Sequence, residues 1–328
     1  MRVVFVYRQS RSGAHSIETV FRAVSAALKD SGVEVIEYVL KTRRHLFADM
    51  IELRRLQADI YHVTGDVNFL VAMLPHAKTV LTVHDIGHYL YGLTGWRKIV
   101  YRWFWLALPM RLAFVVTVPS TATAEAVRLH LGEIAVKARL VELCYSPSFV
   151  PIPKDFDGVC PKILQVGTGH NKNALRIVAA LEGVECELII VGRVTPELQR
   201  ALQLRRVRYQ SHIDVSQAEM VRLYAAADVV AFVSLSEGFG MPIIEAQVMG
   251  KALITSNRPP MSEVAGAHAC LVDPEDVPAI RAGILRLIED EDYRRGVIQN
   301  GLRNVERFSP PSAAARFRRV YVDVHEHA

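Results

Sequence analysis

The stretch of sequence that decides the fold is residues 229–250, which read VVAFVSLSEGFGMPIIEAQVMG. The apolar run Val229–Val233 predicts a strand that is buried on both faces, as strands of parallel sheets are. Gly238 and Gly240 then predict a turn in which the backbone comes close to a ligand, and Pro242 favours the first turn of a helix. The segment therefore predicts a strand, a glycine turn and a helix in succession.

Two glutamates frame this turn. Glu237 precedes it, and Glu245 follows eight residues later, in the first turns of the predicted helix. Because a helix N-terminus presents free N–H groups and the positive end of a dipole, a ligand at this strand end would meet two carboxylates and several amides together. The alternative is that the glutamates merely offset the helix dipole. That alternative explains one acidic residue, but it does not explain two glutamates beside two glycines and a proline.

Short β-branched runs alternate with amphipathic helical patterns along the whole chain, which predicts parallel sheets flanked by helices. In the first half the predicted strands are Val3–Tyr7, Val33–Val39, Ile60–Val63, Thr79–Val83, Phe114–Val118 and Leu140–Leu143. In the second half they are Ile163–Val166, Leu188–Val191, Val207–Tyr209, Val229–Val233, Ala252–Thr255 and Cys270–Val272. The fold class predicted from these two series is α/β.

Two domains are expected, because 328 residues suit two units of roughly 150 residues each. Residues 146–153 contain three prolines and lie between the two strand series, so they predict a linker. The expected domains are 1–150 and 151–308. Ser309 followed by two prolines predicts the start of a last helix over about 312–324.

Charge is unevenly distributed between the halves. Residues 1–150 hold 18 Lys and Arg against 12 Asp and Glu, a net charge of +6, whereas the remainder holds 21 against 22, a net charge of −1. The basic half is expected to meet something anionic. No signal peptide is expected, since the N-terminus runs directly into a strand. The longest apolar run, Trp103–Val118, is too short to span a bilayer.

The four cysteines show no CxxC pairing. They predict buried free thiols in a reducing cytoplasm rather than a zinc site. Two isolated histidines, His62 and His212, are interpreted as structural. His84, Asp85 and His88 leave a metal site open as an alternative, although two histidines and one carboxylate in five residues arise readily by chance in a loop.

Glu237 and Glu245 around Gly-Phe-Gly-Met-Pro resemble the donor-site signature of the family 4 retaining glycosyltransferases. The resemblance extends from about Lys162 to the end of the chain and includes the runs Leu223–Asp228 and Leu271–Pro274. It implies a fold of the GT-B type, with two Rossmann-like domains whose parallel sheets face each other across a cleft. The N-terminal domain would bind the acceptor, with the C-terminal helix 309–328 packed back on it, and domain 151–308 would bind the nucleotide-sugar donor.

The resemblance also implies roles for single residues of the second half. Glu245 matches the glutamate that bonds the donor ribose, and Glu237 matches the one near the transferred sugar. Lys172, in the loop that opens with Gly167, matches a lysine that binds the diphosphate. Many members have an arginine where this chain has Thr168. That departure leaves a cation to be supplied from elsewhere, for which Arg193 is the candidate.

Backbone amides are implied as further donor contacts. Those of Phe239, Gly240 and Met241 match amides that hold sugar hydroxyls or phosphate. In the first half, Gly13 matches a loop glycine that approaches the donor phosphates, and His84 matches an active-site histidine.

The implied reaction is metal-independent transfer of a hexosyl unit, with retention, from a UDP- or GDP-sugar to a glycan or lipid-linked acceptor in surface polysaccharide biosynthesis. No cofactor is expected. A departing diphosphate develops charge, which helix N-termini and one lysine stabilise without a metal. Two alternatives stay open: a sugar-nucleotide enzyme of the same architecture that is not a transferase, such as an epimerase, and a catalytically inactive sugar-nucleotide-binding module.

Three other functions can be considered from these motifs: dinucleotide binding, nucleic-acid binding and membrane contact. Residues 167–172 resemble a dinucleotide fingerprint, but a lysine replaces the third glycine, which disfavours an oxidoreductase. Nucleic-acid binding is not expected. The segment Trp96–Arg111 interleaves cations with three tryptophans. This segment is either an ordinary packed helix or an element that contacts anionic lipid head groups. The protein is expected in the cytoplasm, and contact with the inner face of the membrane stays open as an alternative.

Overall fold

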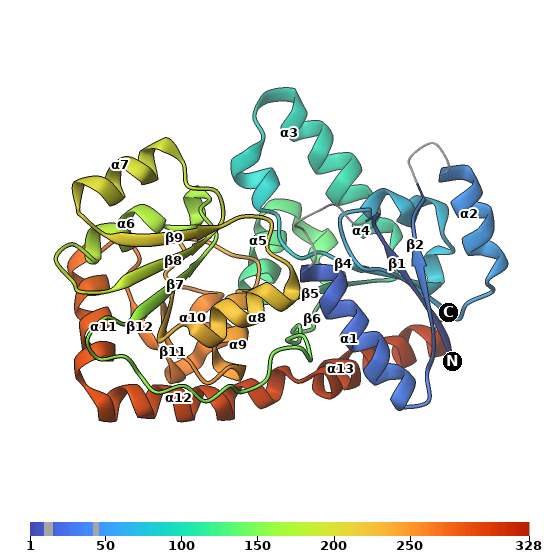
Figure 1. The fold of residues 1–328 in the computed structure, drawn as a ribbon. Helices are drawn as coiled ribbons and strands as arrows, with labels where there is room; N and C mark the ends of the chain where they lie inside the picture. Colours follow the sequence, from blue (N-terminus) through green and yellow to red (C-terminus); the bar gives the residue numbers. More distant parts are fainter. Residues whose placement is uncertain (10–15, 42–45, 328) are drawn as a thin grey trace. The chain divides into compact units, whose positions relative to one another are not determined.

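The computed structural model describes residues 1–9, 16–41 and 46–327. Within it the chain divides into two compact units (Figure 1): unit 1 comprises Met1–Ser146 with Ser309–Ala328, and unit 2 comprises Pro147–Phe308. The division after Ser146 falls within the predicted linker, shortly before the predicted boundary at residue 150. Each unit is an α/β domain, as the alternation of patterns predicts.

Unit 1 is built on a parallel sheet in the order β2-β1-β3-β4-β5-β6 (Figure 1). Its strands are β1 (Arg2–Tyr7), β2 (Glu34–Val39), β3 (Ile60–Val63), β4 (Thr79–Thr82), β5 (Val115–Val118) and β6 (Ala138–Leu140). The four inner strands, β1, β3, β4 and β5, are buried on both faces. This burial accounts for the continuous apolar runs in the sequence.

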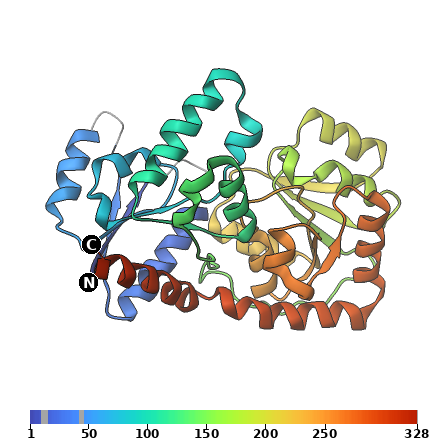
Figure 2. The same ribbon diagram turned by 180° about the vertical axis from the view of Figure 1, so that it is seen from behind.

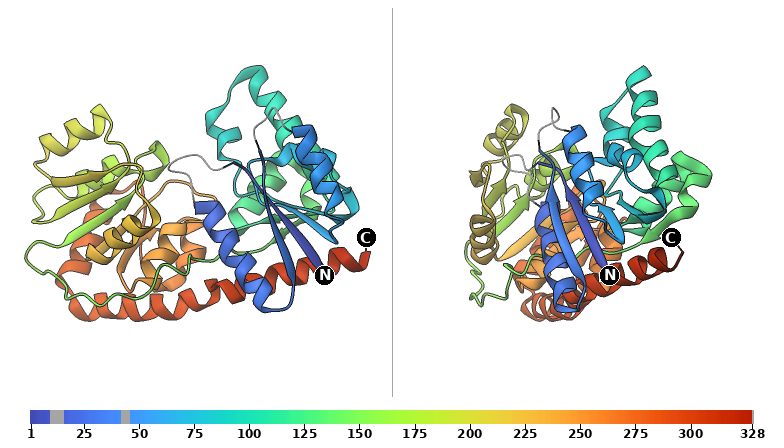
Figure 3. Two further views of the ribbon diagram at one scale, coloured as in Figure 1. Left: turned by 45° about the vertical axis from the view of Figure 1, so that its right-hand side comes forward. Right: turned by 90° about the vertical axis from the view of Figure 1, so that its right-hand side faces the viewer.

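Helices cover both faces of this sheet. They are α1 (Ser16–Asp30), α2 (Leu46–Arg55), α3 (Gly95–Tyr101), α4 (Leu108–Leu112), α5 (Thr121–Leu131) and α13 (Pro310–His327). A π-helical stretch, Arg102–Ala107, joins α3 to α4, so residues 95–112 form one continuous helical segment, drawn in teal in Figure 3. On one face, Leu53, Leu106 and Val127 of the helices join one apolar core with the strands.

The last helix, α13, lies beside α1 (Figure 2), and it begins with the predicted cap. Ser309 Oγ accepts a hydrogen bond from the Ser312 N–H at 3.4 Å. The helix is longer at both ends than the predicted range of about 312–324. Its buried residues Phe317 and Tyr321 pack against Phe21 of α1 and Phe5 of β1.

A buried histidine connects this helix to the sheet. His62 Nδ1 lies 2.6 Å from the Tyr321 hydroxyl, and His62 Nε2 lies 2.7 Å from Thr82 Oγ1. Burial lowers the pKa of His62 to about 3, so the ring is neutral at physiological pH. His62 is thus a fully bonded structural histidine, as predicted. His212 differs, because its Nε2 is buried without a partner in the described structure.

Unit 2 contains the strand-turn-helix segment of residues 229–250. Its sheet is parallel and has the order β9-β8-β7-β10-β11-β12. The strands are β7 (Lys162–Val166), β8 (Glu187–Val191), β9 (Arg208–His212), β10 (Val229–Phe232), β11 (Ala252–Ser256) and β12 (Cys270–Val272). From β7 the chain builds outward to β9 and then returns to β10 on the other side of β7. The carboxyl ends of β7 and β10 therefore form a topological switch point.

Seven helices among the described residues surround the sheet of unit 2: α6 (Ala174–Ala180), α7 (Pro196–Leu204), α8 (Gln217–Ala226), α9 (Met241–Val248), α10 (Met261–Ala265), α11 (Val277–Glu289) and α12 (Glu291–Val305). Ile177, Leu198 and Ile284 place α6, α7 and α11 on one common core with the strands. Helix α8 leads from β9 back to β10 and α9 follows β10, and Tyr224 of α8 contacts Glu245 of α9.

Each of the twelve predicted strands has a counterpart, and one of them is misplaced. The strand predicted at Leu140–Leu143 lies instead at Ala138–Leu140, at the sheet edge, where Arg139 and Leu140 are exposed. Apolar residues after it are buried without extending the strand, so hydrophobicity alone misled the prediction. All four cysteines are free thiols, and Cys160 is only half-buried, unlike the other three. No helix among the described residues is long and apolar enough to cross a bilayer.

The contact between α13 and His62 generates a stability prediction. Tyr321→Phe keeps the ring packing but leaves His62 Nδ1 buried without a partner, which costs about 1–3 kcal/mol. We expect a lower urea midpoint for unit 1. The exposed Tyr91 serves as the matched control, since Tyr91→Phe should leave the midpoint unchanged. Equal midpoints for both variants would show that the His62–Tyr321 contact does not stabilise the unit.

Candidate functional site

The candidate site of unit 2 lies where β7 and β10 end side by side. Two loops follow these strands: residues 167–173 connect β7 to α6, and residues 233–240 connect β10 to α9. Adjacent parallel strands that continue in opposite directions leave a crevice at their carboxyl ends, where ligands bind in doubly wound sheets. The sequence places Gly167 and Lys172 in the first loop and Glu237, Phe239 and Gly240 in the second.

An ion pair joins the two loops. Lys172 Nζ lies 2.7 Å from Glu237 Oε1, and both side chains are largely buried. The ammonium also lies 5.0 Å from the centre of the Phe232 ring at the end of β10. A lysine has three donor hydrogens and Glu237 Oε1 takes one of them, so the ammonium can hold this carboxylate and a further anion together.

Two asparagines on either side of Lys172 fasten the loops to each other. Asn171 donates from Nδ2 to the Ser236 carbonyl at 3.1 Å, and its own carbonyl accepts from the Leu235 N–H at 2.7 Å. Asn173 is buried, has a left-handed backbone (φ 60°), and donates from Nδ2 to the carbonyls of Val233 and Pro274. These bonds fix the position from which Lys172 reaches Glu237.

The glycine turn has the conformation that its sequence predicts. Gly240 has φ 107°, a left-handed value that favours glycine, and it precedes α9 directly. A Cβ at Gly240 would lie 3.0 Å from Ile243 Cδ1. The Phe239 side chain is buried and packs edge-on against Phe308, so only its backbone is available to a ligand. The amides of Phe239, Gly240 and Met241 lie at the start of α9, where N–H groups have no acceptor within the helix.

The backbone amide of Gly167, unlike the amides at the start of α9, is already bonded within the fold. Its N–H donates to the Val191 carbonyl at 2.7 Å, which continues the pairing of β7 with β8. The amide is therefore already used, and only the Cα surface remains for a close approach. The next residue, Thr168, donates from Oγ1 to the Arg193 carbonyl at 2.8 Å. This bond ties the loop to the end of β8, beside which the Arg193 side chain is exposed.

Glu245 is a half-buried carboxylate on α9. Its Oε2 accepts a hydrogen bond from the Tyr224 hydroxyl of α8 at 2.8 Å. Burial raises the pKa of Glu245 to about 7, while the Tyr224 bond and the charge of Lys172 oppose that rise. The pKa of Tyr224 is itself raised by burial, so the phenol stays protonated and donates. Glu245 therefore changes charge near neutral pH.

Unit 1 has polar groups at the carboxyl ends of its own central strands. His84 follows β4, and its Nε2–H donates to the Thr64 carbonyl at 2.7 Å. Gly65 has φ 127°, and a Cβ there would lie 2.6 Å from the His84 ring. Burial lowers the pKa of His84, which keeps the imidazole neutral. Arg8, after β1, bonds Glu18 and Asp66. Gly13 lies outside the described residues.

The described residues form no cluster of three or more histidine, cysteine, aspartate or glutamate side chains suited to a metal. Asp85 instead accepts a hydrogen bond from the Gly87 N–H at 2.7 Å, and His88 packs against the Tyr101 ring. The alternative of a metal site at His84, Asp85 and His88 thus has no support from their geometry.

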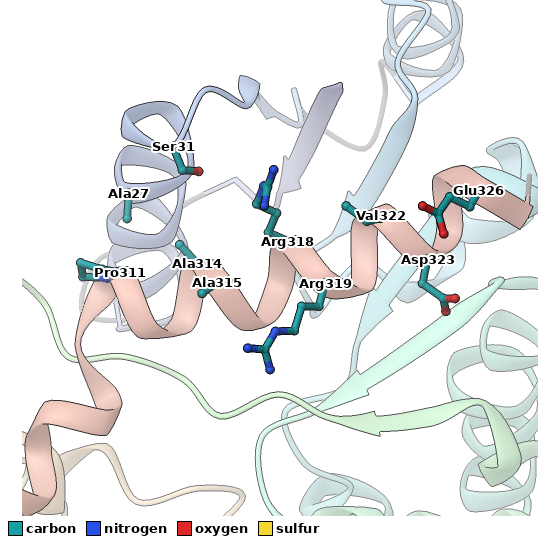
Figure 4. Close-up of a pocket in the computed structure, with 10 residues that line it drawn as sticks. All are labelled: Ala27, Ser31, Pro311, Ala314, Ala315, Arg318, Arg319, Val322, Asp323 and Glu326. Carbon is teal, nitrogen blue, oxygen red and sulfur yellow. The ribbon is translucent and has the colours of Figure 1, made fainter.

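A surface hollow of about 700 Å³ lies between α1 and α13 of unit 1 (Figure 4). Arg318 and Arg319 line it, but their guanidinium groups point in different directions (Figure 4). It lies on helices rather than at the carboxyl ends of strands. The cations do not converge on one point, so the hollow is a weaker candidate than the switch point of unit 2.

Sequence reasoning missed several residues that shape these sites. Asn171 and Asn173 were not singled out, although two asparagines flanking a lysine before a helix are typical of a fastened loop. Tyr224 was noted only as part of a matching run, and Arg8 was overlooked. Nothing in a single sequence indicates that Tyr224 donates to Glu245, because the contact joins two different helices.

Comparisons with known proteins bear on both units. Residues 38–145 match the family model described as Glycosyltransferase Family 4, and residues 160–290 match the model described as Glycosyl transferases group 1. The chain is similar to O-antigen chain mannosyltransferase B of Escherichia coli, with 37% identity over 103 residues that cover 31% of the chain and 26% of that relative. It is also 29% identical to the MMP alpha-(1->4)-mannosyltransferase of Mycolicibacterium hassiacum over 254 residues, which cover 69% of the chain and 59% of that protein. The matched residues thus cover less than two thirds of the length of each of these two relatives.

Among solved structures, the fold is similar to that of HepE from Anabaena in complex with UDP and glucose. The TM-score is 0.75 at 15% identity, with 98% of this chain and 100% of that chain covered. This likeness extends over both units and shows that they share the two-domain α/β fold of that protein.

The fastening of the two loops generates a second prediction. Asn173→Ala leaves two buried carbonyls without their donor, at about 1–3 kcal/mol, and adds about 1–2 kcal/mol for a left-handed alanine. The urea midpoint of unit 2 should fall clearly. Asn173→Gly restores the backbone freedom and should recover only the conformational part. If both variants unfold like the parent protein, Asn173 does not hold the loops together.

Proposed function

The chain is a family 4 glycosyltransferase with the GT-B fold, and we propose that it transfers a hexosyl unit from a UDP- or GDP-sugar to a glycan or lipid-linked acceptor in surface polysaccharide biosynthesis. One observation carries the proposal. At the switch point of unit 2, Lys172 and Glu237 meet at 2.7 Å beside the N-terminus of α9 and the carboxylate of Glu245. The names of the similar proteins, two mannosyltransferases and one complex with UDP and glucose, agree with a sugar nucleotide as donor.

Glu245 is proposed to bind the donor ribose. Ribose hydroxyls are donors, and an ionised carboxylate accepts charge-assisted hydrogen bonds from them. The Tyr224 hydroxyl occupies Oε2, which leaves Oε1 to accept from a ribose hydroxyl. Binding also favours the ionised form of Glu245, whose pKa is about 7 without ligand.

Lys172 is proposed to stabilise the departing diphosphate. As the bond to the sugar breaks, negative charge grows on the phosphate oxygens, and fixed positive groups lower the energy of that state. The ammonium is held by Glu237 before any ligand arrives, so little reorganisation is needed. The amides of Gly240 and Met241 at the start of α9 supply further positive dipoles, and Arg193 is the additional cation proposed at the end of β8.

Glu237 is proposed to lie next to the transferred sugar, since its second carboxylate oxygen remains available once Oε1 is bonded to Lys172. In unit 1, Gly13 is proposed to approach the donor phosphates, and His84 is proposed as an active-site residue. The His84 Nε2–H is used by the Thr64 carbonyl. The neutral ring therefore has only Nδ1 left, as an acceptor for a substrate hydroxyl.

The stereochemistry and metal requirement are part of the same proposal. We infer retention, with the acceptor hydroxyl attacking the anomeric carbon on the face that the diphosphate leaves. The hydroxyl proton then passes to the departing phosphate oxygen, and no protein nucleophile is required. Lys172 and the helix amides take the place of a metal. Peripheral contact of the basic N-terminal domain with an anionic membrane, at its cytoplasmic face, is proposed as the way to a lipid-linked acceptor.

The donor-site assignment predicts nucleotide binding that depends on Glu245. Calorimetric titration with UDP, GDP and ADP, with chelator present, should give micromolar binding of one nucleotide. Glu245→Ala should weaken that binding roughly 10- to 150-fold, through loss of bonds worth about 1.5–3 kcal/mol. Unchanged affinity in this variant would show that Glu245 does not bind the ribose.

The same titrations, repeated at several pH values, test whether the nucleotide binds the ionised form of Glu245. With a pKa of about 7, Glu245 is protonated as pH falls, and nucleotide affinity should drop about tenfold between pH 8 and pH 6. Glu245→Gln, which cannot ionise, should bind with little dependence on pH in that range. A parent profile as flat as that of the glutamine variant would contradict the assignment.

Lys172 generates a prediction about turnover. Because phosphate charge grows toward the transition state, Lys172→Ala should lower kcat more than it weakens nucleotide binding, whereas Lys172→Arg should retain part of the activity. Lys162→Ala, at the partly exposed start of β7, is the matched control and should behave like the parent. The assay follows sugar transfer by product formation. A product formed without acceptor would indicate an epimerase-like reaction. An unchanged kcat in Lys172→Ala would show that Lys172 does not stabilise the transition state.

A further inference from the structure

One face of the helical segment 95–112 exposes an apolar surface that the fold of unit 1 does not use. We call it the outer stripe, and it consists of Trp96 (73% exposed), Ile99 (61%), Val100 (45%), Trp103 (44%), Phe104 (65%) and Leu108 (39%). Their spacing of three and four residues places them along one side of the helix. Surface helices normally carry polar residues there.

The opposite side of the same segment already anchors it. Leu106 and Met110 are buried in the core of unit 1. Trp105 stacks on Tyr101 with ring centres 5.9 Å apart and packs against Phe69. The segment is therefore apolar on both sides, although only one side has a partner among the described residues. Folding does not explain the outer stripe, so an apolar partner outside this chain is expected.

The charged side chains that the segment itself carries are of one sign. Between Ile86 and Ala124 the sequence has four cations, Arg97, Lys98, Arg102 and Arg111, and no aspartate or glutamate. The guanidinium groups of Arg102 and Arg111 both lie 5.6 Å from the Trp103 ring. Cations at the rim of an indole-rich apolar surface match the arrangement of a bilayer interface, where acyl chains lie below anionic head groups.

We propose that the outer stripe docks this protein on an anionic lipid bilayer. The segment would lie in the plane of the interface, with Trp96, Phe104 and Ile99 entering the acyl boundary. It is about 27 Å long at about 1.5 Å per residue, but its inner side is held by unit 1, so it rests on the surface rather than crossing the bilayer. A second copy of the chain fits less well, because two facing segments would bring eight cations together and neither segment supplies a carboxylate.

This surface specifies the membrane contact proposed above and is independent of the donor chemistry. Figure 3 shows the segment extending away from the strands of unit 1. No residue of the segment has a role in the proposed donor site, which uses residues of unit 2 together with Gly13 and His84. Loss of lipid binding and loss of nucleotide binding are therefore separate outcomes.

The test is sedimentation with vesicles of phosphatidylcholine alone and with 30% phosphatidylglycerol, roughly at physiological salt. The parent protein should bind the anionic vesicles, more weakly as salt rises. Trp96→Ser with Phe104→Ser should lower the partition coefficient at least about tenfold, since it removes two aromatic side chains from the interface. Arg97→Gln should lower it about fivefold on anionic vesicles only.

Controls separate docking from folding and from other partners. Leu129→Ser, at a 79% exposed position of α5 in the same unit, should bind vesicles like the parent. Calorimetric nucleotide binding should be unchanged in every variant. The proposal is overturned if the parent ignores anionic vesicles, if the stripe variant binds them fully, or if size-exclusion chromatography shows that the stripe holds copies of the chain together.

Discussion

The pairing of Lys172 with Glu237 depends on a single topological constraint, the side-by-side placement of β7 and β10. The two residues are 65 positions apart in sequence, yet they meet because the chain leaves β7 in one direction and returns to its other side as β10. Both strands are parallel and end at the same edge, so the loops that follow them share one crevice. If the chain returned on the far side of β9, the cation and the carboxylate would be three strands apart.

Rigidity at this crevice comes from the hydrogen bonds of Asn171 and Asn173 to backbone groups, in addition to the ion pair. Asn173 reaches the ends of β10 and β12 through the carbonyls of Val233 and Pro274, and Asn171 joins the Leu235 amide and the Ser236 carbonyl. A flexible lysine alone loses entropy when it is held in place. Here the loop is already ordered, so the Lys172 ammonium is positioned before any ligand arrives. Glu245 adds a carboxylate that burial holds near its point of ionisation.

Unit 1 uses its helices in two ways. Helix α13 closes one face of the sheet through Phe317 and Tyr321, which pack on His62. Burial keeps this histidine neutral, and two hydrogen bonds satisfy its ring nitrogens. The segment 95–112 packs on the other side through its inner residues and keeps an apolar stripe outside. Its cations and indoles make it the part of the chain best suited to an anionic interface, which is consistent with the net charge of +6 of residues 1–150.

The sequence by itself determined the α/β class, the approximate strands and the strand-turn-helix with Glu237, Gly240 and Glu245, because these follow from local periodicity and turn chemistry. It also indicated a linker over residues 146–153, within which the two units divide. It misplaced β6, where burial continues beyond the strand, and it overlooked Asn171, Asn173 and Arg8. It left the segment 95–112 undecided, since Trp103 and Trp105 look alike in sequence although one is exposed and the other packed. Only the tertiary structure decided which side chains meet and which stay uncovered. Burial and pairing are set by strand order and helix packing between residues far apart along the chain, and no local pattern encodes them.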